Sequence, residues 1–156
     1  MRLYFLRHAD AFPGTDDAVR PLSPLGKDQS RAVGKFLKKA GVEFDAAYSS
    51  PLVRAVETAE LVLEVCASKD PLKFADALLN ETGQGEFDRW LKDLPDVKRV
   101  LLVGHEPSMS GRVRHLLGFD NASALSMPKA GLACVDTGEE HGAVLKLFIS
   151  PKSLGL

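Results

Sequence analysis

Short apolar runs of strand type alternate with segments of helical periodicity along the first two thirds of this chain. Residues 3–6 and 100–103 are continuous apolar runs, as expected of strands that are buried on both faces. Between them, apolar residues recur at helical spacing, for example at positions 32, 33, 36 and 37. Alternation of this kind predicts an α/β three-layer sandwich, with a mostly parallel central sheet and helices on both faces.

The turn residues divide the chain into the predicted elements. Ser23 and Pro24 are a favourable N-cap and first helical residue, and Gly41 marks the end of the same helix. Ser50 and Pro51 are expected to begin a second helix in the same way. We predict helices over 25–40, 50–66, 87–94 and 108–117. We predict strands over 3–6, 46–49, 72–75, 100–103, 133–136 and 143–149, the last two on either side of a turn at 138–142.

Length and composition favour one soluble domain over residues 1–156. Of the 156 residues, 45% are hydrophobic and 26% are charged, which is the balance of a globular protein. The net charge of -1 provides no basic field for nucleic acid, so any anion must be held by a local cluster. The apolar run at 3–6 is too short for a signal peptide or a membrane span, so we expect a cytoplasmic protein. Cys66 and Cys134 are expected to be free thiols, and we expect a monomer.

Polar side chains follow three of the predicted strands at the point where each strand ends. Arg7 and His8 follow the first strand, Ser50 and Arg54 follow the second, and His105 follows the run at 100–103. Ligands of parallel sheets bind at the carboxyl ends of the strands, so we expect these side chains to meet at one edge.

Two histidines and two arginines are a suitable set for phosphoryl transfer to histidine. One imidazole, at His8, would attack phosphorus with an unprotonated nitrogen. The guanidiniums of Arg7 and Arg54 would clamp the phosphoryl oxygens, and His105, in its protonated form, would stabilise their charge. Backbone N–H groups at the start of the helix after His105 would add donors for the same anion.

The same residues resemble the motifs of the histidine phosphatase superfamily, which has the phosphoglycerate-mutase-like fold. Arg7-His8-Ala9 is similar to its Arg-His-Gly signature, with alanine in place of glycine. The other matching segments are Leu22-Ser23-Pro24-Leu25-Gly26, the set Ser50, Arg54, Ala55 and Thr58, and Gly104-His105. The resemblance covers residues 1–110 and extends within the superfamily to the SixA-type phosphohistidine phosphatases, which are of similar length.

This resemblance implies a metal-independent phosphatase without a cofactor, in which His8 becomes phosphorylated. It implies that Arg20 also faces the anion, and that Glu81, in Leu79-Asn80-Glu81, is the general acid. Phosphohistidine has a good leaving group, so Glu81 is alternatively dispensable or only shapes the rim. Glu106 is included as a substrate-binding candidate, although its chemical role is open. Ala9 would narrow the pocket or shift the backbone relative to glycine.

The implied substrate is a phosphohistidine on another protein, such as a phosphotransfer domain. Two alternatives stay open: a phosphatase or mutase of a small phosphomonoester, and a non-catalytic phosphate-binding module. A metal site is disfavoured, since His8 and His105 have no second ligand at helical or hairpin spacing and lie beside arginines. We expect Ser50 to cap its helix, and His115 and His141 to be structural or surface residues.

Overall fold

The computed structural model describes residues 1–138, 140 and 142–156. One sheet contains all the named strands in the order β3-β2-β4-β1-β5-β6. The strands are β1 (Arg2–Arg7), β2 (Ala46–Ser49), β3 (Lys73–Phe74), β4 (Arg99–Gly104), β5 (Leu132–Asp136) and β6 (Val144–Ile149). The α-helices are α1 (Pro24–Lys39), α2 (Val53–Val65), α3 (Gln84–Lys92) and α4 (Ser108–Leu117). None of the described helices combines the length and apolarity needed to cross a membrane.

The sheet is parallel over its first four strands and antiparallel over its last two. β1 pairs with β4, β4 with β2 and β2 with β3, all in parallel. β5 runs antiparallel to β1, and β6 runs antiparallel to β5. The mostly parallel sheet predicted from the sequence is therefore confirmed. The parallel strands β1, β2 and β4 are adjacent, so their carboxyl ends lie together at one edge.

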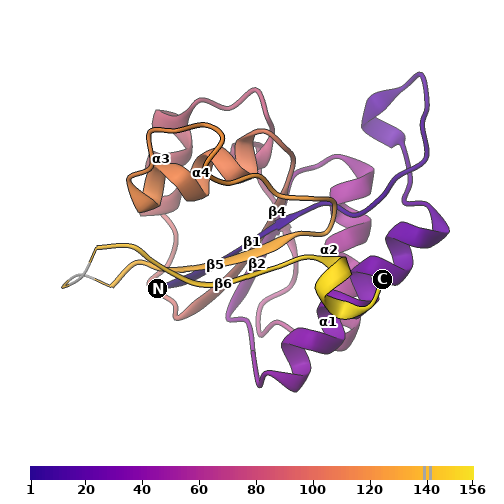
Figure 1. Ribbon diagram of the computed structural model, residues 1–156, viewed down its shortest axis with the longest axis horizontal. Coiled ribbons are helices and arrows are strands. Elements are labelled where there is room, and N and C mark those ends of the chain that lie inside the picture. The colour runs from indigo at the N-terminus through magenta and orange to yellow at the C-terminus, as the bar shows by residue number, and fades with distance from the viewer. Residues whose placement is uncertain (139, 141) are drawn as a thin grey trace.

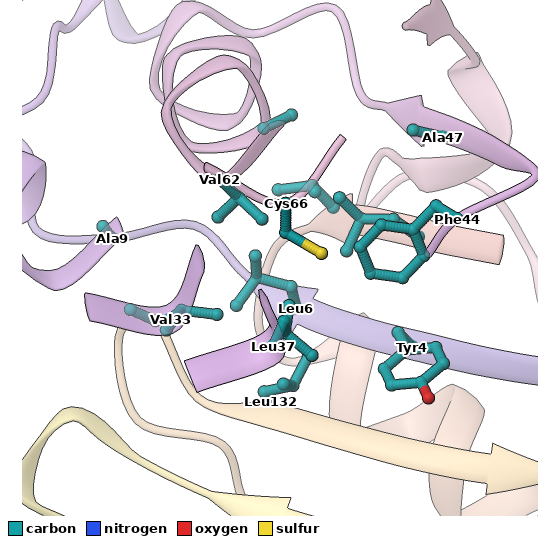
Figure 2. Close-up of a cluster of buried hydrophobic side chains, with 14 of the residues drawn as sticks. Tyr4, Leu6, Ala9, Val33, Leu37, Phe44, Ala47, Val62, Cys66 and Leu132 are labelled. Atoms are coloured by element: carbon teal, nitrogen blue, oxygen red, sulfur yellow. The ribbon is translucent and has the colours of Figure 1, made fainter. Parts of the chain in front are cut away.

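Helices cover both faces of the sheet, as Figure 1 shows. On one face, Tyr4 and Leu6 of β1 pack in a cluster with residues of α1 and α2, including Val33 and Val62 (Figure 2). On the other face, Leu3 and Phe5 of β1 join a second cluster, which includes residues of α3 and α4. The side chains of β1 thus alternate between two cores, which explains why its sequence is apolar at every position from 3 to 6.

The first helix, Pro24–Lys39, lies within one residue of the predicted range 25–40 at each end. The side chain of Ser23 accepts a hydrogen bond from the Gly26 N–H at 3.1 Å, and Pro24 is the first helical residue. Gly41 follows the helix with φ 73°, in the left-handed region that glycine adopts readily. Gly26 also allows a close approach, because a Cβ at that position would lie 1.9 Å from the backbone oxygen of Asp10. The loop after His8 is thereby seated directly on the start of α1.

Several predicted boundaries differ from the structure. The helix expected from Ser50 begins only at Val53, and Leu52 precedes it without a side-chain cap. α3 begins earlier than expected, at Gln84, and β3 is shorter than expected. Short 3-10 helices at Asp17–Val19 and Pro151–Leu154 were not predicted. Within the predicted turn at 138–142, positions 139 and 141 lie outside the described residues, so the expectation for His141 lies there too.

Candidate active site

The carboxyl ends of β1, β4 and β2 bring the predicted residues to one place. The backbone N–H of His8 donates to the Gly104 oxygen at 2.9 Å, and the N–H of Ser50 donates to the Val103 oxygen at 3.0 Å. The ring centroids of His8 and His105 are 5.1 Å apart. Both imidazoles are buried, with 7% and 2% of the residue surface exposed. The two histidines that are 97 positions apart in the sequence therefore share one site.

The backbone fixes the tautomer of His8. Its Nδ1 lies 2.7 Å from the carbonyl oxygen of Ala9. A carbonyl oxygen only accepts hydrogen bonds, so Nδ1 of the neutral ring carries the hydrogen. The lone pair of His8 is therefore on Nε2, the nitrogen that points away from this backbone contact.

The second histidine is held by a serine rather than by a carboxylate. Nε2 of His105 lies 2.6 Å from Oγ of Ser50, while its Nδ1 is buried and has no hydrogen-bond partner among the described residues. Ser50 is itself fully buried. The prediction that Ser50 caps a helix is wrong, because its hydroxyl instead lies beside an imidazole of the site.

Arginine side chains surround the two imidazoles. Arg54 comes from the first turn of α2 and is buried, while Arg7 is the last residue of β1. Nε of both arginines is buried without a hydrogen-bond partner in the described part of the chain. Arg20 lies on the loop before α1, where its Nε is 3.3 Å from Asp17 Oδ1, an ion pair without hydrogen-bond alignment. Nε of Arg7, Nε of Arg54 and Nδ1 of His105 are thus buried and, within the residues that the structure describes, make no hydrogen bond.

Burial and positive charge keep both imidazoles neutral. Burial lowers the pKa of His8 to about 4, and the positive charges of Arg54, Arg7 and Arg20 contribute in the same direction. Burial also lowers the pKa of His105 to about 3, with further contributions from His8 and Arg54. The sequence led us to expect a protonated His105. The neutral form is the stable one at neutral pH, because burial, and then the nearby positive charge of Arg54, disfavour protonation of the ring.

Ala9 fits the backbone that follows the nucleophile. Its N–H donates to Oγ1 of Thr58 at 3.0 Å, and the Thr58 hydroxyl donates to the Arg54 oxygen at 2.7 Å. Ala9 is fully buried, and its φ is not positive, so the position does not require glycine. The side chain of Thr58, in the Arg54-Ala55 motif segment, therefore connects the start of α2 to the loop that carries His8.

Among the described residues, the carboxylates of the two glutamates predicted for the site make no hydrogen bond to its histidines or arginines. Oε1 of Glu106 accepts from the Ser110 N–H at 2.7 Å, and Oε2 accepts from the Ser110 hydroxyl at 2.8 Å and the Met127 N–H at 3.2 Å. Glu81 is exposed in the turn before α3, and its carboxylate makes no hydrogen bond within the described residues. That turn is tied to the β4–α4 loop, since the Asn80 side chain donates to the Glu106 oxygen at 2.8 Å.

Asp17 is a site residue that the sequence reasoning missed. Arg54 Nη1 donates to its backbone oxygen at 2.7 Å, and Arg54 Nη2 donates to its Oδ2 at 3.2 Å. The arginines lower the pKa of Asp17, so its carboxylate is charged. The available signal was weak: an acidic residue three positions before Arg20 in a loop rich in turn residues.

The fold and the paired imidazoles together define the class of this protein, and comparison with known proteins agrees. The model of the histidine phosphatase superfamily (branch 1) matches residues 3–90. The chain belongs to the histidine phosphatase superfamily.

Among its relatives are proteins of similar length and others that are much longer. The phosphohistidine phosphatase SixA of Escherichia coli is 30% identical over 157 aligned positions, covering 99% of this chain and 96% of SixA. An uncharacterized protein of Picosynechococcus is 32% identical, covering 88% of this chain and 86% of its own. A 2,3-bisphosphoglycerate-dependent phosphoglycerate mutase of Bartonella bacilliformis is 40% identical, but only over 46% of this chain and 35% of the mutase.

A solved structure shares almost the whole fold. The protein histidine phosphatase SixA complexed with tungstate superposes with a TM-score of 0.86 at 27% identity, and the match covers 99% of both chains. The similarity to SixA therefore extends over the entire sheet and its helices. These relatives support assigning a phosphatase to this chain.

Proposed function

We propose that this protein is a phosphohistidine phosphatase that removes the phosphoryl group from a phosphohistidine on another protein. The observation that carries the proposal is the pairing of His8, which has a free Nε2, with three buried nitrogens that have no partner among the described residues and that we assign as donors: Nε of Arg7, Nε of Arg54 and Nδ1 of His105. A tetrahedral oxyanion needs such donors around the atom that is attacked. In this proposal residues 1–156 are one histidine phosphatase domain, supported by a sheet whose strands come from both ends of the chain.

In the first step, His8 Nε2 attacks phosphorus while the bond from phosphorus to the substrate imidazole breaks. Arg7 and Arg54 bind the phosphoryl oxygens, with Arg20 nearby. We assign the Ser50 hydroxyl as the donor to His105 Nε2, which places the hydrogen of His105 on Nδ1. His105 then binds a phosphoryl oxygen as a neutral donor. The departing imidazole takes a proton from solvent and leaves as a neutral ring.

In the second step, water attacks the phosphorylated His8 and releases inorganic phosphate. The ring retains its Nδ1 hydrogen bond to Ala9, so phosphorylation at Nε2 leaves it positively charged and a good leaving group. The proton of the attacking water passes to solvent or to phosphate. Neither step uses a metal or a cofactor, and Glu81 is not required as an acid because an imidazole leaves readily.

The choice of a protein substrate depends on the similarity to SixA over the full chain. The mutases match over only 46% of this chain and 35% of their own length, so they carry less weight in the choice of substrate. We propose a cytoplasmic location on the same grounds.

The test is incubation of the enzyme with a phosphotransfer protein carrying phosphohistidine, and in parallel with a panel of phosphomonoesters. We expect phosphate release from the protein and little from the esters. A His8→Ala variant should lose turnover and should form no acid-labile phosphoenzyme. Faster turnover of a sugar phosphate than of the phosphoprotein would favour a metabolite phosphatase. Oxyanion binding by wild type without any phosphoenzyme would favour a non-catalytic module.

A further inference from the structure

Two arginines at the site are each connected to a carboxylate, Arg54 to Asp17 directly and Arg7 to Glu106 through Met127. We propose that Glu106 and Asp17 are positioning residues, Glu106 for Arg7 and Asp17 for Arg54. Each would fix its arginine in the orientation that binds the phosphoryl group. This inference rests on the proposed oxyanion site, and it gives Glu106 a role other than direct contact with substrate.

Glu106 acts on Arg7 through the loop before β5. Arg7 Nη1 donates to the Met127 oxygen at 2.9 Å, and the N–H of the same residue donates to Glu106 Oε2 at 3.2 Å. The other oxygen of Glu106 accepts from the Ser110 N–H in the first turn of α4. Met127 is buried, with 2% of its surface exposed. The carboxylate therefore joins α4 to Met127, the residue whose carbonyl oxygen accepts from the Arg7 guanidinium.

The charge of Glu106 suits this role better than substrate contact. Both of its oxygens are occupied by N–H and O–H donors, and a negative charge is favourable at the start of a helix. Burial lowers the pKa of Arg7 and Glu106 opposes that effect, so the carboxylate also favours the charged guanidinium. A carboxylate in direct contact with a phosphoryl dianion would be repelled by it.

Asp17 acts on Arg54 directly. Its backbone and carboxylate oxygens accept from Nη1 and Nη2 of Arg54, while the buried Nε has no hydrogen-bond partner among the described residues. The second carboxylate oxygen of Asp17, Oδ1, lies 3.3 Å from Nε of Arg20. Arg54 is nearly buried whereas the Asp17 side chain is 68% exposed, so this contact should be the weaker of the two.

The experiment is a pair of double-mutant cycles with tungstate affinity as the readout, measured by titration calorimetry. Glu106→Gln must leave one backbone N–H, of Ser110 or Met127, facing an NH₂ group, and should weaken tungstate binding by about tenfold. Asp17→Ala should weaken it by about threefold. In an Arg7→Lys background, the effect of Glu106→Gln should fall below about twofold, while in an Arg54→Lys background it should persist. The effect of Asp17→Ala should instead disappear in the Arg54→Lys background and persist in the Arg7→Lys background.

Asp45→Asn is the matched control, because Asp45 accepts from the backbone N–H groups of Lys98 and Arg99 at the opposite edge of the sheet. It should leave tungstate affinity unchanged, even if thermal melting shows that it destabilises the fold. Equal losses for Glu106→Gln in both arginine backgrounds would overturn the proposal for Glu106. Tighter binding by Asp17→Ala would overturn the proposal for Asp17, since its carboxylate would then compete with the anion.

The binding cycles are independent of the identity of the substrate. If the expected couplings occur but phosphohistidine is not hydrolysed, the positioning roles stand and the proposed function fails. If phosphohistidine is hydrolysed without these couplings, the proposed function stands and the positioning roles fail. With an active enzyme, Glu106→Gln should raise KM by more than it lowers kcat, since Arg7 binds the phosphoryl group in the ground state as well as during transfer.

Discussion

The two buried imidazoles predict a loss of stability at mildly acidic pH. The pKa of His8 is lowered from 6.5 to about 4 by folding, and that of His105 to about 3. Between pH 7 and pH 5, the unfolded chain therefore takes up a proton at each histidine while the native protein takes up almost none. Proton binding to the unfolded state alone makes unfolding more favourable as the pH falls.

The size of this effect follows from linkage. At pH 5, proton binding stabilises an unfolded histidine of pKa 6.5 by about 2 kcal/mol more than it stabilises native His8, whose pKa is about 4. Because pH 5 lies above both native pKa values, the native imidazoles bind few protons. The loss in the free energy of unfolding therefore depends mostly on the pKa of the unfolded histidines. His105 contributes a similar amount, so we expect the two together to remove about 4 kcal/mol. The carboxylates Asp10 and Asp17 have lowered pKa values, so their contribution is lost only at pH values below 3.8, outside this window.

The assay is urea unfolding at pH 7 and pH 5, with the free energy of unfolding extrapolated to water. A His8→Asn/His105→Asn variant is the control, since it removes the two imidazoles and leaves the remaining titratable groups. The difference between the two pH values should be about 4 kcal/mol smaller in this variant than in wild type. An equal difference in the two proteins would refute the assignment of neutral, buried imidazoles.

Three further predictions concern the geometry of the site. Ser50→Ala removes the hydroxyl beside His105 Nε2, so it should lower kcat by about tenfold, with the Nδ1 hydrogen signal of His105 altered in NMR spectra. Sulfate binding should become several-fold tighter from pH 7.5 to pH 5.5 in wild type, since a bound dianion favours protonated imidazoles, and calorimetry on His105→Asn should show a weaker dependence. Gly26→Ala should lower the free energy of unfolding by about 2 kcal/mol or more, measured by urea unfolding, because its Cβ would clash with the Asp10 backbone. Gly83→Ala is the control, because the space around it is open, and it should lower the same free energy by only a few tenths of a kcal/mol.

Sequence patterns predicted the parts of the molecule that depend on neighbouring residues. The apolar runs of β1 and β4 and the cap at Ser23 were confirmed, and parallel strand order brought His8 and His105 together. The boundary errors have a local cause. Ser50 followed by Pro51 is a good helix start in sequence, but its hydroxyl lies beside His105 instead, and α2 begins at Val53. A tertiary contact of this kind is not visible in local spacing.

The roles of the carboxylates depend on distances that no sequence pattern contains. Glu106 follows His105 directly, which suggested contact with substrate, yet both of its oxygens point to donors of α4 and the loop before β5. Asp17 lies in a loop with Pro13, Gly14 and Pro21, where the pattern predicted only irregular structure. Its contact with Arg54 joins residues 37 positions apart in the sequence. Side-chain direction, and not residue type, decides what each acid does here.

The electrostatics of the site explain how a histidine can be a nucleophile among arginines. Burial, and to a smaller extent the guanidiniums that would bind a phosphoryl group, lower the pKa of His8, so its Nε2 is unprotonated at neutral pH without a general base. A bound phosphoryl dianion offsets this positive charge, which favours the cationic ring formed when Nε2 is phosphorylated. Under the proposed chemistry, the arginines thus favour a neutral imidazole before attack, and the phosphoryl group favours a charged one afterwards. In this proposal His8 is therefore neutral before the phosphoryl anion binds, and it becomes cationic when the bond from Nε2 to phosphorus forms.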